Sequence, residues 1–545
     1  MRIIIMQLMM KTLQRTIAYA LTVICLGIGM TAYAQTLTQR IILQDTPDSL
    51  LQKSFHRYFD KEGNYCFIVE KAKKQYFILT THDTLGPFCY VGSIWGRTYG
   101  RTGEIVYVRE QSEQPDGPLY YVSGSGTKVY GPAVGKIQLY VADSESGGVA
   151  LTTLSNDTVH RYLNCREVLC CHRTEMRERD ITDEKWAAFS QNGHALYSVK
   201  KDTLYRMYVD GRVVDSAAFQ FIELAINNNG DYIFAEGFRP QQPIGRYDYL
   251  FYVHANEASF DKVRTVWYHT LREDGGFYYS GDDNGPDYIL VNGDLYRDMD
   301  ETSNFRLYDK DNYLFTYRKN RHNWLNVNGK SYPLKFKKAM SPSMDEHGNF
   351  ALYGMKGYRL YKYVNGKKGS KPLSKYGVRA TPLYISPQGE SLHYFETDDS
   401  IYLYRDETLL LPPLSANDRF GIHSSYRLFN QYSFDANPHN LIYMQYGQNN
   451  YWVFDGQLSP PLSMNDPELY LDSFYPEIVT GEINEKGFYA IQRVGERSYC
   501  VVMNNRIYPI EGQIDKILHN CFSFDGSQLV FYGIKENAYY QFVIK

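Results

Sequence analysis

The chain has 545 residues, of which 43% are hydrophobic, 22% charged and 15% aromatic. This composition is that of a folded globular protein, and it excludes a disordered, collagen-like or membrane-spanning chain. The formal net charge is −3, and because residues 1–34 contribute three basic residues and no acidic ones, the remainder is near −6. This net negative charge excludes the overall positive potential that is typical of nucleic-acid-binding proteins.

Residues 1–34 are predicted to be a signal peptide. An apolar run of 14 residues (17–30) follows two basic residues and is too short to cross a bilayer. Ala32-Tyr33-Ala34 then supplies an A-x-A cleavage site. The alternative, a lipoprotein anchor at Cys25, is disfavoured because Ile24 stands where lipoprotein signals carry a small residue. We therefore expect an exported protein that is periplasmic, outer-membrane associated or secreted, without a transmembrane segment.

Seven cysteines remain after residue 34, which is an odd number and too few for a disulfide framework. At least one of them must be unpaired or paired between chains. The hydrophobic core, rather than cross-links, is expected to hold the fold.

A turn that usually contains glycine recurs along the chain, each time followed by an alternating apolar strand. Its clearest copies are marked by Gly193, Gly230, Gly275, Gly348, Gly389, Gly487 and Gly526, with weaker copies at Gly63, Gly103 and Gly147 and with Asn312 and Asn437 in the same slot. The eleven steps between residues 63 and 526 average about 42 residues, which indicates a structural repeat.

A second turn follows the first after 17 to 19 residues in six repeats. The pairs are Asp210-Gly211, Asn292-Gly293, Asn328-Gly329, Asn365-Gly366, Asp455-Gly456 and Asn504-Asn505. Asn-Gly and Asp-Gly supply the positive φ that two-residue type I′ hairpin turns need. We expect both turns of each repeat to be tight two-residue hairpins, so that each repeat has four short strands, named a to d.

One repeat shows the pattern clearly, with strands predicted at 383–386, 391–396, 401–405 and 408–411. Apolar and polar residues alternate along them, as in a sheet with one better-buried face. Four-stranded units at this period are typical of β-propeller blades, and no helical repeat pattern is present. The sequence therefore predicts an all-β fold, a β-propeller of about 12 repeats.

Two segments carry a family resemblance. Ser386-Pro387-Gln388-Gly389 and Ser523-Phe524-Asp525-Gly526, each followed by an apolar strand and then a second strand such as 401–404, resemble the WD40-like repeat of TolB-type propellers. The likeness covers most of the chain after residue 34, best from 186 onward. The pattern departs from the family in that proline occupies its slot only at Pro387 and the consensus aspartate is often Asn, His or Lys. The resemblance implies a binding scaffold of the bacterial envelope.

The last repeat ends before its second turn and lacks strand d. An open edge there would favour aggregation, so we expect residues 40–43 to supply the missing strand and close a ring. Twelve units exceed the usual 4 to 8 blades of a propeller. We therefore predict two propellers in tandem, residues 35–303 and 304–545.

Function is predicted to reside on the face that carries the b–c and d–a loops, because long loops on a rigid scaffold commonly carry binding sites. Tyr and Arg are frequent anchors of protein interfaces. The predicted binding residues are Arg239, Arg246, Arg419, Tyr426, Arg427 and Tyr475. We expect a non-catalytic scaffold for a protein partner; the alternative is a glycan-binding or glycan-cleaving propeller with paired carboxylates in its channel.

The sequence contains no complete motif for catalysis or metal binding, so no catalytic residue, metal or cofactor is predicted. Cys165, Cys170, Cys171 and His172, with His160 upstream, lack the spacing of a zinc knuckle, and neighbouring residues of a strand point to opposite faces. The acidic segment 282–287 has its glycine in the wrong place for a calcium loop, and Gly329-Lys330-Ser331 lacks the first glycine of a phosphate loop. No G-x-S-x-G, H-E-x-x-H or sialidase S-x-D-x-G sequence is present.

Overall fold

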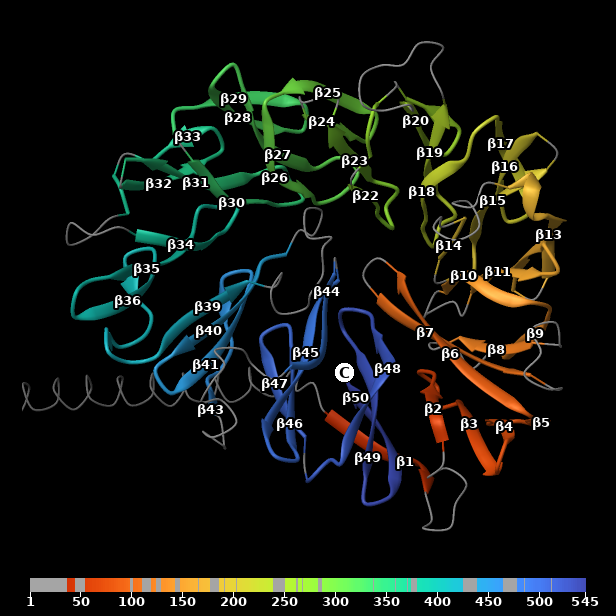
Figure 1. Cartoon of the computed structure of the whole chain (residues 1–545). Coiled ribbons are helices and arrows are strands. Elements are labelled where there is room, and N and C mark those ends of the chain that lie inside the picture. The colour runs from red at the N-terminus through yellow and green to blue at the C-terminus, as the bar shows by residue number, and fades with distance from the viewer. Residues whose placement is uncertain are drawn as a thin grey trace, which may run out of the picture.

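The computed structural model is all-β and arranges twelve four-stranded blades in a ring (Figure 1). It describes residues 37–44, 54–98, 101–109, 119–123, 129–142, 148–164, 166–176, 186–190, 192–201, 203–238, 250–260, 263–266, 268–282, 287–336, 338–357, 359–369, 371–373, 380–424, 439–463, 478–484, 486–510 and 512–545. We number the blades 1 to 12 in chain order, beginning with the sheet β2–β5. The β-propeller class predicted from the repeats is confirmed.

The first six blades contain β2 (Ser54–Phe59), β3 (Tyr65–Ala72), β4 (Gln75–Thr80), β5 (Thr84–Phe88); β6 (Tyr90–Thr98), β7 (Arg101–Arg109), β8 (Leu119–Ser123), β9 (Val129–Ala133); β10 (Lys136–Ala142), β11 (Val149–Ser155), β12 (Thr158–Leu163), β13 (Arg166–His172); β14 (Ala187–Phe189), β15 (Ala195–Lys201), β16 (Leu204–Val209), β17 (Arg212–Ala217); β18 (Phe221–Ile226), β19 (Tyr232–Phe238), β20 (Leu250–Ala255), β21 (Ala258–Ser259); and β22 (Tyr268–Leu271), β23 (Phe277–Asp282), β24 (Asp287–Val291), β25 (Asp294–Met299). A single 3₁₀ turn within the described residues, η2 (Arg173–Glu175), follows β13.

The last six blades contain β26 (Glu301–Leu307), β27 (Tyr313–Lys319), β28 (His322–Val327), β29 (Lys330–Leu334); β30 (Lys338–Met344), β31 (Phe350–Lys356), β32 (Arg359–Val364), β33 (Lys367–Lys368); β34 (Ala380–Ile385), β35 (Ser391–Glu396), β36 (Ser400–Arg405), β37 (Thr408–Leu409); β39 (Phe420–Ser424), β40 (Leu441–Tyr446), β41 (Asn449–Phe454), β42 (Gln457–Leu458); β44 (Ile478–Asn484), β45 (Gly487–Gly495), β46 (Ser498–Met503), β47 (Arg506–Pro509); and β48 (Lys516–Phe524), β49 (Leu529–Lys535), β50 (Ala538–Ile544) with β1 (Leu37–Gln44). Two short strands, β38 (Leu414–Ser415) and β43 (Leu462–Ser463), add to blades 9 and 10 by pairing with β36 and β41.

The turns between strands c and d are the two-residue turns that the sequence predicts. Both central residues have positive φ in all six predicted copies, for example 50° and 83° at Asp210 and Gly211. This is the type I′ geometry, whose twist matches that of the flanking strands. The Asn-Gly and Asp-Gly pairs therefore set the register of the c–d hairpins.

The first residue of these turns has a second role. Its side-chain oxygen accepts a hydrogen bond from a backbone N–H within one residue of the start of strand b in the same blade. The distance is 2.7 Å between Phe277 N and Asn292 Oδ1. Asn164, Asp210, Asn256, Asn292, Asn328, Asn365, Asp406, Asp455 and Asn504 all make this bond. The backbone N–H of each returns a bond to the carbonyl of the same partner residue. Asn and Asp therefore suit this position for two reasons: their side chains accept the hydrogen bond, and they tolerate the positive φ of the turn.

The turns between strands a and b follow the two-residue prediction only in part. In blade 11 Asn484 pairs with Gly487, and in blade 12 Asp525 N donates to Gln528 O at 3.1 Å, so both turns have two residues. The turns at Gly63, Gly193, Gly230, Gly275, Gly348 and Gly389 are instead three-residue loops in which the glycine N–H donates to the carbonyl three residues earlier, at 3.0 Å between Gly193 N and Ser190 O and 2.8 Å between Gly389 N and Ser386 O. Only the glycine has positive φ, which is a type I turn followed by a left-handed residue. The two-residue expectation failed here because the glycine alone does not distinguish the two loop lengths.

The N-terminal strand closes the ring, as predicted from the truncated last repeat. β1 pairs antiparallel with β50, with Arg40 opposite Gln541, and Arg40 Nε donates to Gln541 Oε1 at 2.6 Å. β1 therefore serves as strand d of blade 12, and Figure 1 shows it beside the blue C-terminal strands.

A buried hydrophobic cluster fills each of the twelve interfaces between neighbouring blades. One of them joins blade 12 to blade 1, where Phe59 and Tyr532 stack with ring centroids 4.6 Å apart. Large aromatic and aliphatic side chains thus lie between the sheets, and the core is a ring of interfaces.

The blade count had predicted two propellers divided near residue 303, but the structure continues one ring across this position. Residue 303 lies inside β26, and a single cluster packs Ile289 and Val291 of blade 6 against Phe305 and Phe315 of blade 7. Two closed propellers would instead need blade 6 to pack on blade 1. The division into residues 35–303 and 304–545 as separately folding units stays a prediction.

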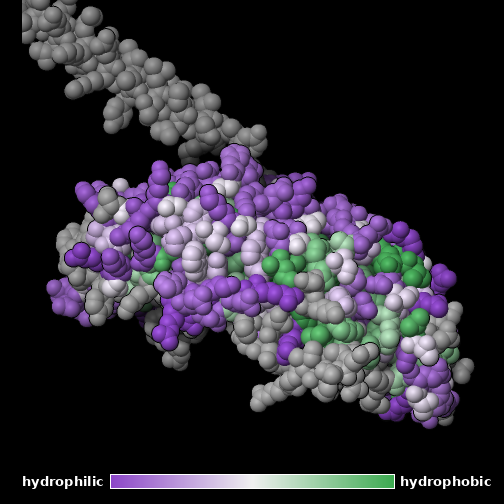
Figure 2. Space-filling view, turned by 90° about the horizontal axis from the view of Figure 1, so that it is seen from above, coloured by the Kyte–Doolittle hydropathy of each residue, from purple (hydrophilic) through white to green (hydrophobic). Residues whose placement is uncertain are grey.

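The two faces of the ring are less different than predicted. The a–b and c–d turns lie on one face, but several b–c turns on the other face are also tight, with positive φ at both residues of Asn156-Asp157, Asn320-Arg321 and Glu536-Asn537. Gly237 lies near the end of strand β19. The ring is flat when seen from its edge (Figure 2). Within the described ranges, no helix has the length and apolar character needed to cross a membrane.

Candidate functional site

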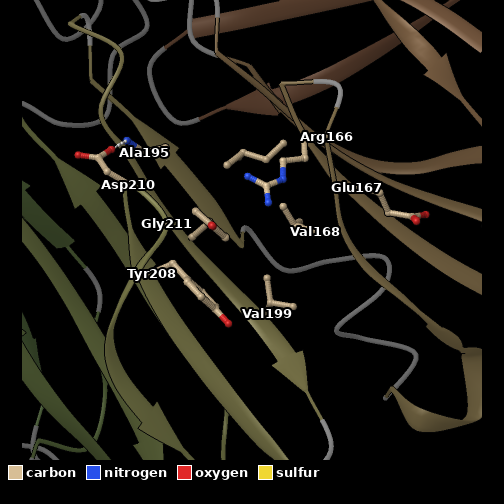
Figure 3. Close-up of a pocket in the computed structure, with 10 residues that line it drawn as sticks. Arg166, Glu167, Val168, Ala195, Val199, Tyr208, Asp210 and Gly211 are labelled. Carbon is tan, nitrogen blue, oxygen red and sulfur yellow. Dashed lines mark hydrogen bonds between the residues drawn. The ribbon is translucent and has the colours of Figure 1, made fainter.

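A cavity of about 420 Å³ lies between blades 3 and 4, at the face that carries the a–b and c–d turns. Its two walls are β13 with the end of β12 on one side and the hairpin β15–β16 on the other (Figure 3). The lining residues are Leu163, Arg166, Glu167, Val168, Ala195, Tyr197, Val199, Tyr208, Asp210 and Gly211.

One wall is formed by two stacked tyrosines. Tyr197 and Tyr208 lie directly opposite each other across β15 and β16, with ring centroids 5.0 Å apart and an angle of 6° between the rings. Burial raises the pKa of the Tyr197 phenol, an effect that Tyr208 and Asp210 increase and Arg166 opposes. The hydroxyl therefore stays neutral, and the pair offers a rigid surface that is apolar on its ring faces and polar at its tip.

The opposite wall carries Arg166 beside Leu163 and Val168. Figure 3 shows the Arg166 side chain reaching into the cavity, whereas Glu167 points away from it. Arg166 is exposed, and among the described residues it forms no hydrogen bond or ion pair. A guanidinium with five donors and no partner in a concave site is suited to a carboxylate or phosphate.

The acidic groups at the rim are already engaged. Asp210 Oδ1 accepts from Ala195 N at 2.8 Å, and its Oδ2 lies 2.7 Å from His194 Nδ1. Glu167 Oε1 lies 2.6 Å from His160 Nδ1. These acids are therefore held by neighbours, and Arg166 is the charged group left to meet a ligand.

The same interface between blades 3 and 4 contains a buried group that does not itself line the cavity. Arg161 is 3% exposed, stacks 5.0 Å above the ring of Trp186 and donates from Nη1 to the carbonyl of Ser198 at 3.3 Å. Ala150, Ala187 and Ala195 complete the cluster. Because these groups are buried and interlocked, the walls are pre-organised for binding.

Only one of the six predicted binding residues lies in the described part of the chain. Arg419 precedes β39, is exposed, and its carbonyl accepts from Gly447 N at 2.8 Å. Arg239, Arg246, Tyr426, Arg427 and Tyr475 lie outside the described residues. The cavity of Figure 3 lies on the opposite face, so the role of the six residues stays a prediction.

Sequence reasoning missed this cavity, although a signal for part of it exists. Tyr197 and Tyr208 become cross-strand partners once the Lys201 and Leu204 ends of the hairpin are paired, so their stacking follows from register. The approach of Arg166 from the next blade has no such signal, because it depends on how two blades pack.

The cysteine and histidine residues weighed in the sequence are partly brought together. His160 and Cys170 are cross-strand partners, and one ligand atom each of His160, Glu167 and Cys170 lies within 4.8 Å of the others. Cys171 packs on the other face of the strand with Val159 and Met176, as alternation predicts, and Cys165 lies outside the described residues. The described cysteines are free thiols, and burial raises the pKa of Cys66, Cys500 and Cys521 to about 12.

A glycan-cleaving propeller would need two carboxylates close together on the inner strands, near the central channel. Glu223 lies on the inner strand β18, and its Oε2 is 3.1 Å from His269 Nδ1 on the inner strand of the next blade. This inner-strand acid is thus paired with a histidine.

No protein-family model and no curated protein matches the sequence. Solved structures align with it at low identity and low TM-score. One is a eukaryotic initiation factor, with 9% identity over 67% of this chain and 97% of that chain and a TM-score of 0.27. Another is the Dos1 propeller, with 12% identity over 59% and 92% of the two chains and a TM-score of 0.27. A third is the β-propeller domain of the trilobed protease from Pyrococcus furiosus, with 14% identity over 59% and 95% and a TM-score of 0.23.

Proposed function

We propose that the protein is an exported β-propeller scaffold that binds a protein partner, and that the cavity between blades 3 and 4 receives an anchor side chain of that partner. The observation that carries the proposal is that Arg166, which has no hydrogen bond or ion pair within the described residues, faces the stacked Tyr197 and Tyr208 across a pre-formed cavity. Tyr and Arg in concave, rigid surroundings are the residues that most often dominate protein interfaces. Export is supported by the signal-peptide pattern of residues 1–34.

The chemistry of the cavity defines the anchor. Leu163, Val168 and Val199 provide an aliphatic surface beside the tyrosine rings, which suits a leucine-sized or aromatic side chain. Arg166 then pairs with a carboxylate at the edge of the same partner segment. The expected partner therefore presents an apolar side chain next to an acidic one.

The test uses residues 35–545 as bait for an extract of the source organism's envelope, followed by affinity measurements with the captured protein. Truncating a central interface residue often costs about 2 kcal/mol, so Arg166→Ala and Tyr208→Ala are each expected to weaken binding about 30-fold. Arg359→Ala, an exposed arginine in blade 8, is the control and should leave affinity unchanged.

Two further measurements distinguish this proposal from an interface on the opposite face and from glycan binding. Arg419→Ala probes the opposite face, and a loss there without a loss at Arg166 and Tyr208 would place the interface on the long loops. Glycosidase treatment of the extract would abolish capture if the ligand is a glycan, which would move the assignment to the glycan alternative.

A further inference from the structure

Three side chains with metal-binding groups meet at the interface between blades 4 and 5, away from the cavity described above. Asp215 lies on β17, the outer strand of blade 4. Glu236 and His254 lie on β19 and β20 of blade 5 and project from the same face of that sheet, since Phe234 pairs with His254 and Glu236 follows two residues later. One ligand atom from each of the three lies within 4.8 Å of the other two.

The distances place the imidazole between the two carboxylates. His254 Nε2 is 3.3 Å from Glu236 Oε2, and His254 Nδ1 is 3.7 Å from Asp215 Oδ2. Asp215 Oδ1 accepts from Ser216 N at 2.7 Å, which orients the carboxylate and leaves Oδ2 facing the histidine. The imidazole stacks on Phe234 with ring centroids 4.6 Å apart, which holds its plane.

The group is incomplete as it stands. His254 Nε2 is buried and has no hydrogen-bond partner among the residues that the structure describes, although buried polar atoms are rarely left without one. Two carboxylates share one imidazole, and within the described part of the chain neither forms an ion pair with Lys or Arg. The side chains of Asp215, Glu236 and His254 are 28%, 23% and 13% exposed, so the site is half-buried. It therefore carries surplus negative charge, and its imidazole nitrogen is available to coordinate a cation.

We propose that Asp215, Glu236 and His254 bind a divalent transition-metal ion, with Zn²⁺ the best match. An imidazole and two carboxylates are ligands that Zn²⁺ accepts, and three protein ligands leave a fourth tetrahedral position for water from the exposed side. In a tetrahedral site, two ligand atoms that each lie about 2.0 to 2.2 Å from the ion are roughly 3.4 Å from each other. The 3.3 Å distance between Glu236 Oε2 and His254 Nε2 already matches this spacing. The charge of +2 balances both carboxylates and leaves the histidine neutral.

The position of the site gives the ion a structural role. Asp215 comes from one blade and the other two ligands from the next, so the ion links two blades that otherwise meet through the cluster around Met207, Phe221 and Phe234. An ion that binds only the folded protein raises its apparent stability in proportion to the logarithm of its concentration.

The experiment is a Zn²⁺ titration of the tag-free chain 35–545 after treatment with a chelator, followed by calorimetry and by thermal unfolding. We expect one equivalent of Zn²⁺ and a melting temperature that rises with Zn²⁺ concentration. Asp215→Asn and Glu236→Gln should each weaken binding at least about tenfold and remove the thermal shift. Asp215 is the most exposed of the three, so its variant is expected to fold even where another does not.

Cys170→Ser is the matched control, because His160, Glu167 and Cys170 form the other described cluster with a similar spacing. Zn²⁺ binding that survives Cys170→Ser and is lost in Asp215→Asn and Glu236→Gln supports the proposal. Binding lost in Cys170→Ser, retained in the two carboxylate variants, or absent from the wild-type chain overturns it and leaves the triad as an ion pair.

Discussion

At the scale of single residues, the Asn or Asp that opens a c–d turn in nine of the blades has two roles. It adopts positive φ, and its side-chain oxygen binds the first N–H of strand b, as Asn292 does for Phe277. The steady spacing of these residues in the sequence reflects both constraints. Hydrogen bonding explains why Asp replaces Asn at 210, 406 and 455 without change of geometry, since both carry an acceptor.

Asn292→Ala is expected to destabilise the protein by about 1–3 kcal/mol, because the N–H of the buried Phe277 loses its acceptor. Asn292→Asp keeps the acceptor and loses only the bond from Nδ2 to the Lys310 carbonyl. Its cost should be clearly smaller. Denaturant unfolding of both variants checks the prediction, and equal losses would contradict it.

Gly211→Ala tests the φ requirement without a steric contribution. The glycine has φ of 83°, and a Cβ at this position would contact nothing within 4 Å. A cost of about 1 kcal/mol is expected from the left-handed conformation alone. Gly237→Ala, in β19 with ordinary φ and a nearest neighbour at 3.4 Å, is the comparison and should cost less in the same thermal unfolding assay.

At the scale of elements, the ring depends on a strand that comes from the opposite end of the chain. β1 pairs with β50 along seven residue pairs and adds Leu37, Ile42 and Leu43 to the clusters on either side of blade 12. Without it, β50 would be an exposed edge strand.

Deleting residues 36–46 is expected to lower the melting temperature and to increase aggregation, because the edge of β50 becomes free to pair with other chains. Ile41→Ser is the control, since the Ile41 side chain is 54% exposed and the strand remains. Thermal unfolding and size-exclusion chromatography measure the two effects. Unchanged behaviour of the deletion variant would show that β1 does not hold the ring closed.

At the scale of the whole molecule, charge is unevenly distributed. Residues 318–379 contain 15 of the 58 Lys and Arg residues but only 2 of the 61 Asp and Glu residues. They belong mainly to blades 7 and 8, where Lys330, Lys356, Arg359, Lys367 and Lys368 are exposed. Figure 2 shows hydrophilic residues covering the side on which Figure 1 places β29 and β33.

Because salt screens charges beyond about 10 Å, a local basic cluster acts independently of the net charge. We expect the chain to be retained by a cation exchanger at pH 7.5 and low salt, although its pI is about 6.5. Lys367→Glu with Lys368→Glu should lower the salt concentration needed for elution. The same charge change made at Lys61 and Lys136 in other blades should have less effect, and equal shifts would contradict a local cluster.

The sequence by itself determined the repeat, the four-stranded blade, the type I′ turns and the closing strand. Each of these follows from local chemistry: alternation within a strand, positive φ at Asn-Gly, and an unpaired edge at a truncated repeat. The three-residue a–b loops were not separated from two-residue turns, because the same glycine suits both.

Tertiary structure alone decided how many blades share one ring and what meets between them. Every blade interface is filled by similar aromatic and aliphatic side chains, so the sequence does not record that blade 6 packs on blade 7 and blade 12 on blade 1. The approach of Arg166 to Tyr208, and of Asp215 to His254, likewise joins residues of different blades. Such contacts depend on the angle and spacing of whole sheets, which no local pattern of residues encodes.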